Sequence, residues 1–421
     1  MTESSLPEAE PSGPAPSRAA TFFIFITIVL DVLAMGMVVP VLPSLIEQVG
    51  GVKGTQTIVI FGVFGTVWAV MQFFSSPIQG ALSDRFGRRP VILISNFGMG
   101  ANYLLMAMAP NLAWLFVGRI VSGVCAGSIP AAMAYLADVN PPEKRAASFG
   151  LLGAAFSLGF SFGPAMGGLL GNAFGPRAPF WAAAALSLLN FLYGVFVLPE
   201  SLPRDRRAPI NFWRLNPVGA LYGLWRSYPS LGGMLVVAFL LALAQQGPNN
   251  VFVLYTQHRY KWSPAQVGLL MTGFGVGGMI VQAGLVAPAI KRLGERGSML
   301  VGGVLQMAGL TLFGLARTGT QFWAALPISS VAAIGGPAWS SIMSRAVGPS
   351  EQGRLAGATA SLSSIGAIVG PVLFTRSFAI AETKGSILPP GAPFFLAAAF
   401  LAAGIGLAAW VTRRAAPIVG A

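Results

Sequence analysis

Twelve long apolar stretches separated by short polar segments constrain the fold of this chain more than any other feature. The stretches cover residues 21–43, 57–81, 90–109, 112–137, 146–170, 178–198, 230–256, 263–290, 298–316, 320–344, 353–376 and 393–412. Each is long enough to cross about 30 Å of hydrocarbon as a helix. Only 9% of the 421 residues are charged, whereas a soluble domain has about 25%. The pattern predicts an all-α integral membrane protein with six plus six membrane-spanning helices.

The polar segments divide the chain into two halves. Residues 1–20 are rich in Pro, Ser, Ala and Glu and lack the basic start and apolar centre of a signal peptide. We expect a disordered cytosolic tail at 1–20, an N-terminal six-helix bundle at 21–198, a cytoplasmic linker at 199–229, a C-terminal six-helix bundle at 230–412 and a cytosolic tail at 413–421.

The positive charges predict the orientation of these helices. With both termini in the cytoplasm, 18 of the 26 Lys and Arg residues lie inside, seven lie outside and Arg119 lies within a span. Such an excess is typical of cytoplasmic loops, so the net charge of +13 reports topology and does not indicate nucleic-acid binding. The only cysteine, Cys125, excludes an internal disulfide, and the only histidine, His258, falls in an expected outer loop and disfavours a His-based metal site.

A short basic loop shows that the two halves are copies of one unit. The loop at 80–90 reads Gly-Ala-Leu-Ser-Asp-Arg-Phe-Gly-Arg-Arg-Pro, and 207 residues later (287 − 80) its skeleton returns as Ala-Pro-Ala-Ile-Lys-Arg-Leu-Gly-Glu-Arg-Gly. The same offset relates the set Gly150, Gly159, Gly163 and Pro164 to the set Gly357, Gly366, Gly370 and Pro371. The duplication predicts two bundles related by a pseudo-two-fold axis along the membrane normal.

Three charges reverse sign together between the copies. Asp84, Arg88 and Asp138 become Lys291, Glu295 and Arg345. Three mutually contacting charges would need such a coordinated change to keep their attraction. We therefore expect an Arg88–Asp138 contact and a Glu295–Arg345 contact at the cytoplasmic face. The alternative is that solvated loop charges changed independently.

Two charged residues lie inside predicted spans. Asp31 is ten residues beyond Thr21, about 15 Å along a helix and hence near the midplane. An ionisable group there normally faces a cavity or a partner. Arg119 is the expected partner of Asp31, and a carboxyl placed in this way can take up and release a proton. The alternatives are a structural Asp31 that caps a broken helix near Gly36 and Pro40, and an Arg119 that extends to the outer interface or binds backbone carbonyls.

The fifth apolar stretch contains a face of small residues. Ala155, Gly159, Gly163 and Gly167 follow one another at four-residue spacing, with Pro164 and Gly168 beside them and Gly150 before them. This spacing places the small residues on one helix face and lets another helix approach closely. Pro164 removes a backbone hydrogen bond and permits a bend.

These motifs resemble the major facilitator superfamily, and within it the tetracycline-resistance-type drug:proton antiporters. The loop Gly80-x-x-x-Asp84-Arg85-x-Gly87-Arg88-Arg89 is similar to the superfamily's loop signature, and the residues Gly150 to Gly168 are similar to its antiporter signature. Closer similarity to the tetracycline group lies in Leu30-Asp31, Pro40-Val41-Leu42-Pro43, Met71-Gln72-Phe73, Tyr135-Leu136-Ala137-Asp138, Leu198-Pro199-Glu200-Ser201, Leu293-Gly294-Glu295-Arg296 and Gly370-Pro371-Val372-Leu373-Phe374-Thr375.

The resemblance implies proton-coupled efflux of a small amphipathic compound by alternating access, in a bacterial cytoplasmic (inner) membrane. It implies that Asp31 carries the proton and that the loop Gly80–Arg89, with Asp138, Lys291, Glu295 and Arg345, forms a cytoplasmic gate. The expected partners are a small-molecule substrate, protons and the lipid bilayer, with no nucleic acid, and a monomer is expected to be sufficient. No cofactor is expected apart from the proton gradient as energy source, although the substrate could arrive chelated to a metal ion.

The chain departs from the tetracycline group at three positions. Asn102 and Gln306 stand where that group has Asp, and Gly278 stands where it has His. These changes favour a neutral or weakly cationic drug held by the amides Gln72, Asn102, Gln245, Gln246 and Gln306, although each amide could instead form an interhelical hydrogen bond. A tetracycline-type antibiotic is the first candidate, and the alternatives are a multidrug or metabolite exporter and a proton-coupled uptake symporter. One His and one buried Asp do not supply a catalytic cluster, so we do not expect an enzyme.

Overall fold

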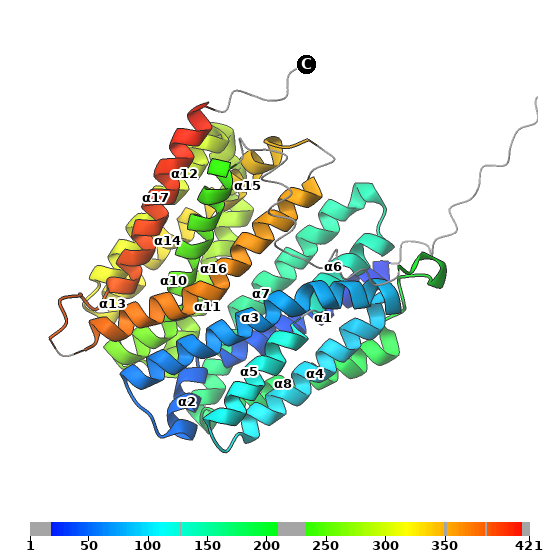
Figure 1. Ribbon diagram of the computed structural model, residues 1–421, viewed down its shortest axis with the longest axis horizontal. Coiled ribbons are helices and arrows are strands. Elements are labelled where there is room, and N and C mark those ends of the chain that lie inside the picture. The colour runs from blue at the N-terminus through cyan, green and yellow to red at the C-terminus, as the bar shows by residue number, and fades with distance from the viewer. Residues whose placement is uncertain (1–17, 127, 209–231, 349–351, 384, 415–421) are drawn as a thin grey trace, which may run out of the picture.

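The computed structural model describes residues 18–126, 128–208, 232–348, 352–383 and 385–414. Within these ranges the chain forms helices joined by turns and short connections (Figure 1). Most of the expected tail at 1–20, the linker at 199–229 beyond residue 208 and the tail at 413–421 beyond residue 414 lie outside the described residues.

The first half of the chain forms one bundle, which we call the N-terminal bundle. Its helices are α1 (Arg18–Val38), α2 (Leu42–Gly50), α3 (Thr55–Phe86), α4 (Arg88–Met108), α5 (Leu112–Cys125), α6 (Ser128–Val139), α7 (Pro142–Phe174) and α8 (Ala178–Val197), followed by the 3₁₀ turn η1 (Arg204–Arg206).

The second half forms the C-terminal bundle. Its elements are α10 (Gly232–Tyr260), α11 (Pro264–Gly284), α12 (Val286–Leu315), α13 (Gly319–Ala324), α14 (Leu326–Val331), the 3₁₀ turn η4 (Ala332–Ile334), α15 (Gly335–Arg345), α16 (Gln352–Ala381) and α17 (Ala392–Arg414). Buried apolar side chains fill the interior of each bundle, so each half has its own packed core.

Eleven helices in the described ranges are long and apolar enough to span a membrane. The predicted tenth span, 320–344, is not one continuous helix, because the chain crosses the bundle there as α13, α14, η4 and α15 (Figure 1). Pro327 and Pro337 each lack the N–H that a continuous helix needs. The two-bundle fold expected from the sequence is confirmed, and the tenth crossing is made of short pieces.

The structure preserves the 207-residue register of the duplication. The predicted fourth span, 112–137, is also divided, since α5 ends at Cys125 and α6 begins at Ser128, 207 residues before α15 begins at Gly335. Gly87, between α3 and α4, has φ +107°, and its counterpart Gly294, at a kink within α12, has φ +70°. Only glycine adopts these values without strain, which explains a glycine at the same turn of both copies.

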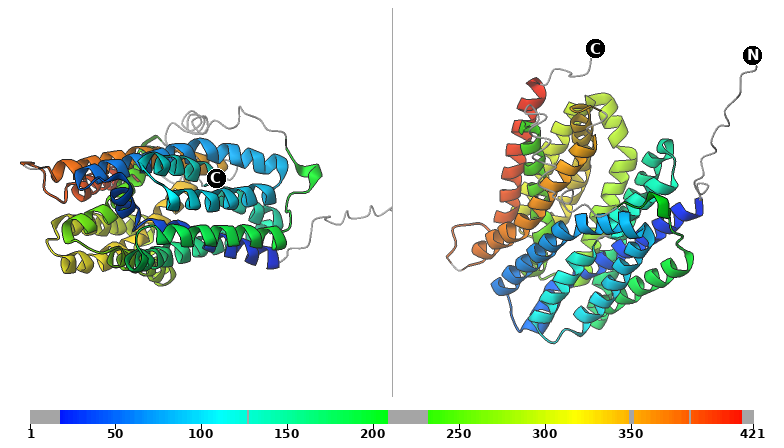
Figure 2. Two further views of the ribbon diagram at one scale, coloured as in Figure 1. Left: turned by 90° about the horizontal axis from the view of Figure 1, so that it is seen from below. Right: turned by 45° about the vertical axis from the view of Figure 1, so that its right-hand side comes forward.

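The two bundles contact each other mainly through two helix pairs. The last part of α7 packs against the first part of α11, where the Thr272 hydroxyl donates to the Ser161 carbonyl at 2.5 Å. The first part of α3 packs against the last part of α16, where the Thr66 hydroxyl donates to the Ile368 carbonyl at 2.9 Å. We call the end of the molecule where α3 ends and α4 begins the basic end. The contacts lie toward the opposite end, and the bundles run apart toward the basic end (Figures 1 and 2).

Candidate functional site

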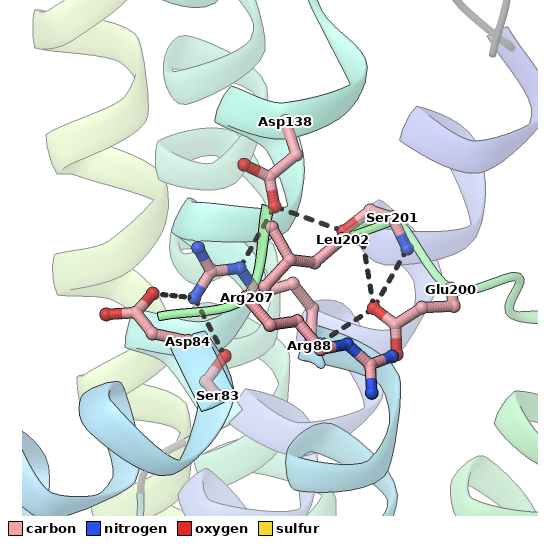
Figure 3. A network of polar contacts seen from close by, with 8 residues as sticks. All are labelled: Ser83, Asp84, Arg88, Asp138, Glu200, Ser201, Leu202 and Arg207. Atoms are coloured by element: carbon pink, nitrogen blue, oxygen red, sulfur yellow. Dashed lines mark hydrogen bonds and ion pairs between the residues drawn. The ribbon is translucent and has the colours of Figure 1, made fainter. Parts of the chain in front are cut away.

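At the basic end, Arg88 holds three helices of the N-terminal bundle together. Its Nη1 donates to Asp84 Oδ1 at 2.5 Å and to Ser83 Oγ at 3.1 Å, both on α3, and its Nε donates to Asp138 Oδ2 on α6 at 3.0 Å (Figure 3). Only 10% of the Arg88 side chain is exposed. Charge-assisted hydrogen bonds of this kind are about twice as strong as neutral ones, so this network fixes the ends of α3, α4 and α6 relative to one another.

Glu200, just after α8, completes this network. Its Oε1 accepts from the backbone N–H groups of Arg88 at 2.8 Å, Ser201 at 3.0 Å and Leu202 at 3.1 Å (Figure 3). The Ser201 hydroxyl donates in turn to Asp138 Oδ2 at 3.3 Å. A carboxylate is favourable at a helix N-terminus because the first N–H groups point toward it. Glu200 therefore caps α4 from a distant part of the chain.

From the sequence, Glu200 was expected only as part of the motif Leu198-Pro199-Glu200-Ser201 in the linker. A signal was present in the sequence. The helix that starts at Arg88 follows Gly87, which has no side chain to serve as a cap, and it begins Arg-Arg-Pro without an acidic residue. The cap had to come from another segment.

The second copy contains the ion pair with reversed charges. Arg345 Nη2 lies 2.8 Å from Glu295 Oε1, which also accepts from the Ser341 hydroxyl at 2.6 Å. Both contacts expected from the sign reversal, Arg88–Asp138 and Glu295–Arg345, are therefore present. The copies differ in burial, because 76% of the Arg345 side chain is exposed. Lys291, the counterpart of Asp84, takes part in none of the ion pairs within the described ranges.

The remaining loop residues have separate neighbours. The Arg85 guanidinium lies 5.7 Å from the centre of the Phe86 ring. Arg89 Nη2 donates to the Val195 carbonyl at 2.6 Å and so ties α4 to α8. Gly80 faces open space on α3. Only part of the predicted gate loop therefore belongs to the Arg88 network.

Asp31 lies on α1 inside the N-terminal bundle and contacts α8. Its Oδ1 accepts from Asn190 Nδ2 at 2.8 Å, and the same nitrogen donates to the Thr27 carbonyl at 3.1 Å. Arg119 donates instead to the Phe64 carbonyl at 3.4 Å. The expected Asp31–Arg119 pair is not among the ion pairs of the described residues, and the backbone-carbonyl alternative for Arg119 is the one observed.

Depth along the bundle explains why the two charges do not meet. Gly118, beside Arg119, packs on Asn102 and Met106 of α4, which places Arg119 at the level of Tyr103. Asn190 is at the level of Phe97, because Phe191 contacts that ring at 5.3 Å between ring centres. Phe97 and Tyr103 are six residues, or about 9 Å, apart along α4. Tyr103 itself is buried, with 4% of its surface exposed.

The glycine face of α7 packs closely on α1, as its spacing predicted. Gly159 lies against Val32 and Leu33, Gly163 lies against Gly36, and a Cβ on Gly167 would overlap the Met37 carbonyl. Gly168 and the Pro164 carbonyl instead contact the start of α11 in the other bundle. Gly150 faces open space and makes no such contact.

The predicted substrate amides are dispersed over both bundles. Asn102 is 1% exposed and lies between α4 and α5, with its Nδ2 3.8 Å from Met106 Sδ. Gln246 Oε1 accepts from Asn250 at 3.1 Å, and Gln245 is exposed on α10. Gln72 on α3 and Gln306 on α12 are half-buried. In the described part of the chain, the five amides form no hydrogen bond with one another.

A pocket of about 410 Å³ lies between the bundles at the end opposite the basic end. Its lining includes Glu47 and Lys53 from the N-terminal bundle and Gln257 and His258 from the C-terminal bundle. Gln257 Nε2 donates to the Pro40 carbonyl at 2.8 Å, and His258 Nε2 lies 2.9 Å from Glu382 Oε2. His258 belongs to the last turn of α10, so its assignment to an outer loop was wrong. The described residues contain no group of three His, Cys, Asp or Glu side chains suited to a metal ion.

Two bundles that repeat one another, contact along one half of their length and bury ionisable residues define a class of membrane transporters rather than enzymes. The family model of the Major Facilitator Superfamily matches residues 24–371 and 234–419 in two overlapping matches. The chain therefore belongs to the Major Facilitator Superfamily.

Individual relatives agree with this assignment. The chain is 38% identical to the tetracycline resistance protein, class C, of Escherichia coli over 86% of this chain and 90% of that protein. It is 35% identical to the class G protein of Vibrio anguillarum over 86% of this chain and 91% of that protein. Among solved structures, the human organic anion transporter TETRAN superposes with a TM-score of 0.71 at 25% identity, covering 93% of this chain and 99% of that chain.

Proposed function

We propose that this chain exports a small amphipathic drug across a bacterial cytoplasmic membrane in exchange for protons, with a tetracycline-type antibiotic as the first candidate. The observation that carries the proposal is the way the bundles contact each other away from the basic end and run apart toward it. Such an arrangement is one of the two states that alternating access requires. The names of the bacterial relatives supply the drug class.

The charge distribution supports an orientation for this state. Arg85, Arg88, Arg89 and Arg345 all belong to the basic end, and an excess of Lys and Arg is typical of cytoplasmic loops. We therefore propose that the basic end and both termini face the cytoplasm and that the observed state is open inward. A single chain contains both bundles, so a monomer is sufficient in this scheme.

Proton exchange would take place at Asp31. A carboxyl inside a bundle is costly to keep charged, and Asp31 Oδ1 accepts a hydrogen bond from Asn190. We propose that drug entry from the cytoplasm accompanies loss of the Asp31 proton and that protonation from the outer side accompanies drug release. No resident cofactor is part of the scheme, and the drug would travel either free or as its Mg²⁺ chelate.

The drug would lie between the bundles. Gln72, Gln245, Gln246 and Gln306 are the proposed polar contacts, because none of them is fully buried within its own bundle. Asn102 is almost completely buried, so we propose that it acts on the drug only through its neighbours. The Arg88 network and the Glu295–Arg345 pair are proposed to form the cytoplasmic gate.

Everted membrane vesicles test the proposal. Acidifying the vesicle lumen should drive uptake of tetracycline with Mg²⁺ by the natural chain, and Asp31→Asn should abolish that uptake while leaving the protein folded. Uptake that does not depend on lumen pH, or a fully active Asp31→Asn variant, contradicts proton coupling at this residue. A susceptibility panel in a pump-deleted host would identify the drug if tetracycline is not transported.

A further inference from the structure

The interior of the N-terminal bundle beside Asp31 contains a concentration of buried polar atoms. Thr27 and Asn96 are 1% exposed and Asn190 is 0% exposed. Thr27 Oγ1, Asn190 Oδ1 and both polar side-chain atoms of Asn96 have no hydrogen-bond partner in the described part of the chain. Buried polar groups are nearly always hydrogen-bonded, to protein or to ordered water. Four such atoms in one region point to water as their partner.

The three residues come from three helices and lie at one height in the bundle. Asn190 on α8 reaches both Thr27 and Asp31, which lie on successive turns of α1. Asn96 is next to Phe97, which contacts Phe191 of α8. Asn96 also lies one turn beyond Ile92 on α4, a side chain that belongs to the same buried cluster as Ile28 of α1. Asn96 therefore lies at the level of Asn190, on the side of α4 that carries Ile92.

The polar atoms continue toward the basic end. Tyr193 lies on α8 one turn closer to that end than Asn190, and its hydroxyl is buried without a partner among the described residues. Its ring contacts Phe23, near the start of α1, at 5.6 Å between ring centres. Asn190 and Tyr193 thus line the side of α1 that leads from Asp31 to the basic end.

The equivalent positions of the duplicated half carry no polar side chains. Gly159 lies against Leu33 of α1, and its counterpart Gly366 lies against Leu243 of α10. The first helices of the two halves, α1 and α10, are therefore related by an offset of 210 residues (243 − 33). The sequence Ala178-Pro179-Phe180 is repeated at 392–394, which gives an offset of 214 for the last helices. With 207 for the third helices, the counterparts of Thr27, Asp31, Asn96 and Asn190 are Val237, Leu241, Gly303 and Gly404.

The packing supports this alignment. Gly404 lies against Leu240 and Leu241, just as Asn190 lies against Asp31. Gly303 lies against Ile405, the counterpart of Phe191. A site of the same shape is therefore polar in one half and apolar in the other. The C-terminal bundle folds with nonpolar residues at these four positions, so folding alone does not require polar residues there. The polar residues of the N-terminal bundle therefore indicate a functional role.

We propose that Thr27, Asn96 and Asn190 hold ordered water molecules beside Asp31, and that this hydrated site is the route by which the Asp31 proton reaches the solution at the basic end. The inference rests on the proposed function, in which Asp31 carries the proton. When the carboxylic acid is deprotonated, its O–H bond breaks and the proton passes to the nearest water, which becomes hydronium. Water-to-water transfers past Tyr193 then deliver the proton to the solution, and the carboxylate keeps its hydrogen bond from Asn190.

This assignment separates two paths. The proton moves inside the N-terminal bundle, while the drug moves between the bundles. Asn96 and Asn190 act as positioning residues, because they hold the water and do not themselves exchange the proton. A defect in the water site should therefore slow steps that need proton release and spare steps that do not.

The first experiment compares two transport modes in proteoliposomes with tetracycline and Mg²⁺ as the probe. Uptake driven by an acidic lumen needs proton release, whereas exchange of labelled for unlabelled drug at equal pH does not. Asn96→Leu keeps the side-chain shape but removes the hydrogen-bonding atoms, and Asn96→Ser restores a hydroxyl. Thr256→Val is the matched control, since Thr256 is also fully buried but bonds within α10.

Asn96→Leu should slow driven uptake by about tenfold, the loss expected when hydrogen bonds to a charged group disappear. Its exchange rate should remain within about twofold of the natural chain, Asn96→Ser should recover most of the driven rate, and Thr256→Val should change neither rate. Equal losses in driven uptake and exchange, or no loss in either, would overturn the proposal.

The second experiment needs no drug. Infrared spectroscopy of the purified protein after a pH jump follows the carbonyl stretch of protonated Asp31, assigned by its loss in Asp31→Asn. The band should respond about tenfold more slowly in Asn96→Leu than in Thr256→Val. Equal response rates, or no Asp31 band at any pH, overturn the water route. A slowed response in a protein that moves no tetracycline would reject the proposed drug and support the water route.

Discussion

Replacing Glu200 tests whether a residue of the interbundle connection determines the stability of the basic end. Glu200 Oε1 accepts three backbone N–H groups, and one of them, from Arg88, belongs to the N-terminus of α4. Glu200→Ala removes all three hydrogen bonds and leaves the first N–H of α4 without its cap. Glu200→Gln keeps an acceptor oxygen in place but removes the charge.

The expected magnitude follows from these contacts. Loss of a helix cap costs about 0.5–2 kcal/mol, and a hydrogen bond to a charged group contributes about 1.5–3 kcal/mol. The Glu200 side chain is 28% exposed, so water replaces part of the loss, and we expect about 2 kcal/mol for Glu200→Ala and about half of that for Glu200→Gln. For a unit of 150–250 residues this corresponds to a fall in Tm of about 4–8 °C and about 2–4 °C, respectively.

Thermal unfolding of the detergent-solubilised protein, followed by tryptophan fluorescence, measures both shifts. Asp205→Ala is the matched control, because Asp205 is an exposed acid in the same segment that makes no ion pair within the described ranges. It should leave Tm unchanged. An equal fall in Tm for Asp205→Ala and Glu200→Ala would refute the capping argument, and so would an unchanged Tm in Glu200→Ala.

Two further predictions concern the glycine face and the second ion pair. Gly167→Ala places a Cβ on the Met37 carbonyl and should lower the yield of folded protein, whereas Gly150→Ala enters open space and should be neutral or slightly stabilising. Size-exclusion chromatography measures the yield of both variants, and equal yields would contradict the close approach of α7 to α1. Glu295→Arg and Arg345→Glu should each slow drug export by up to about fivefold, the limit for a partly exposed pair. The double variant with both charges reversed should restore the export rate. A double variant no faster than either single variant would show that the pair has no role in transport.

The sequence predicted the features that depend on spacing along the chain. The 207-residue register correctly placed Gly87 and Gly294 at equivalent turns, and the reversed charges correctly paired Arg88 with Asp138 and Glu295 with Arg345. The glycine spacing on α7 correctly predicted a close helix neighbour. These features follow from helix periodicity and from duplication, both of which are visible in the sequence.

Features that depend on the relative depth of helices were missed. Arg119 and Asp31 both lie inside apolar stretches, but the position of α5 against α4 places Arg119 near Tyr103, about two turns from the level of Asp31. Periodicity gives no such offset between helices. Asn190 was not considered, although an amide in an apolar stretch is a candidate partner for a buried carboxylate. The division of the tenth span follows from Pro327 and Pro337, whose effect on a membrane helix depends on its neighbours.

A disulfide across the closed end tests alternating access most directly. Thr375 Cβ lies 3.0 Å from the position of a Cβ added to Gly62, and these two residues join α3 to α16; the Cβ atoms of a disulfide lie about 3.5–4.5 Å apart. The measurement is the export rate of Gly62→Cys with Thr375→Cys, in a Cys125→Ser background, before and after reduction. If the bundles must separate at this end during transport, the oxidised protein does not export and reduction restores export. Equal export by the oxidised and reduced forms would contradict this requirement.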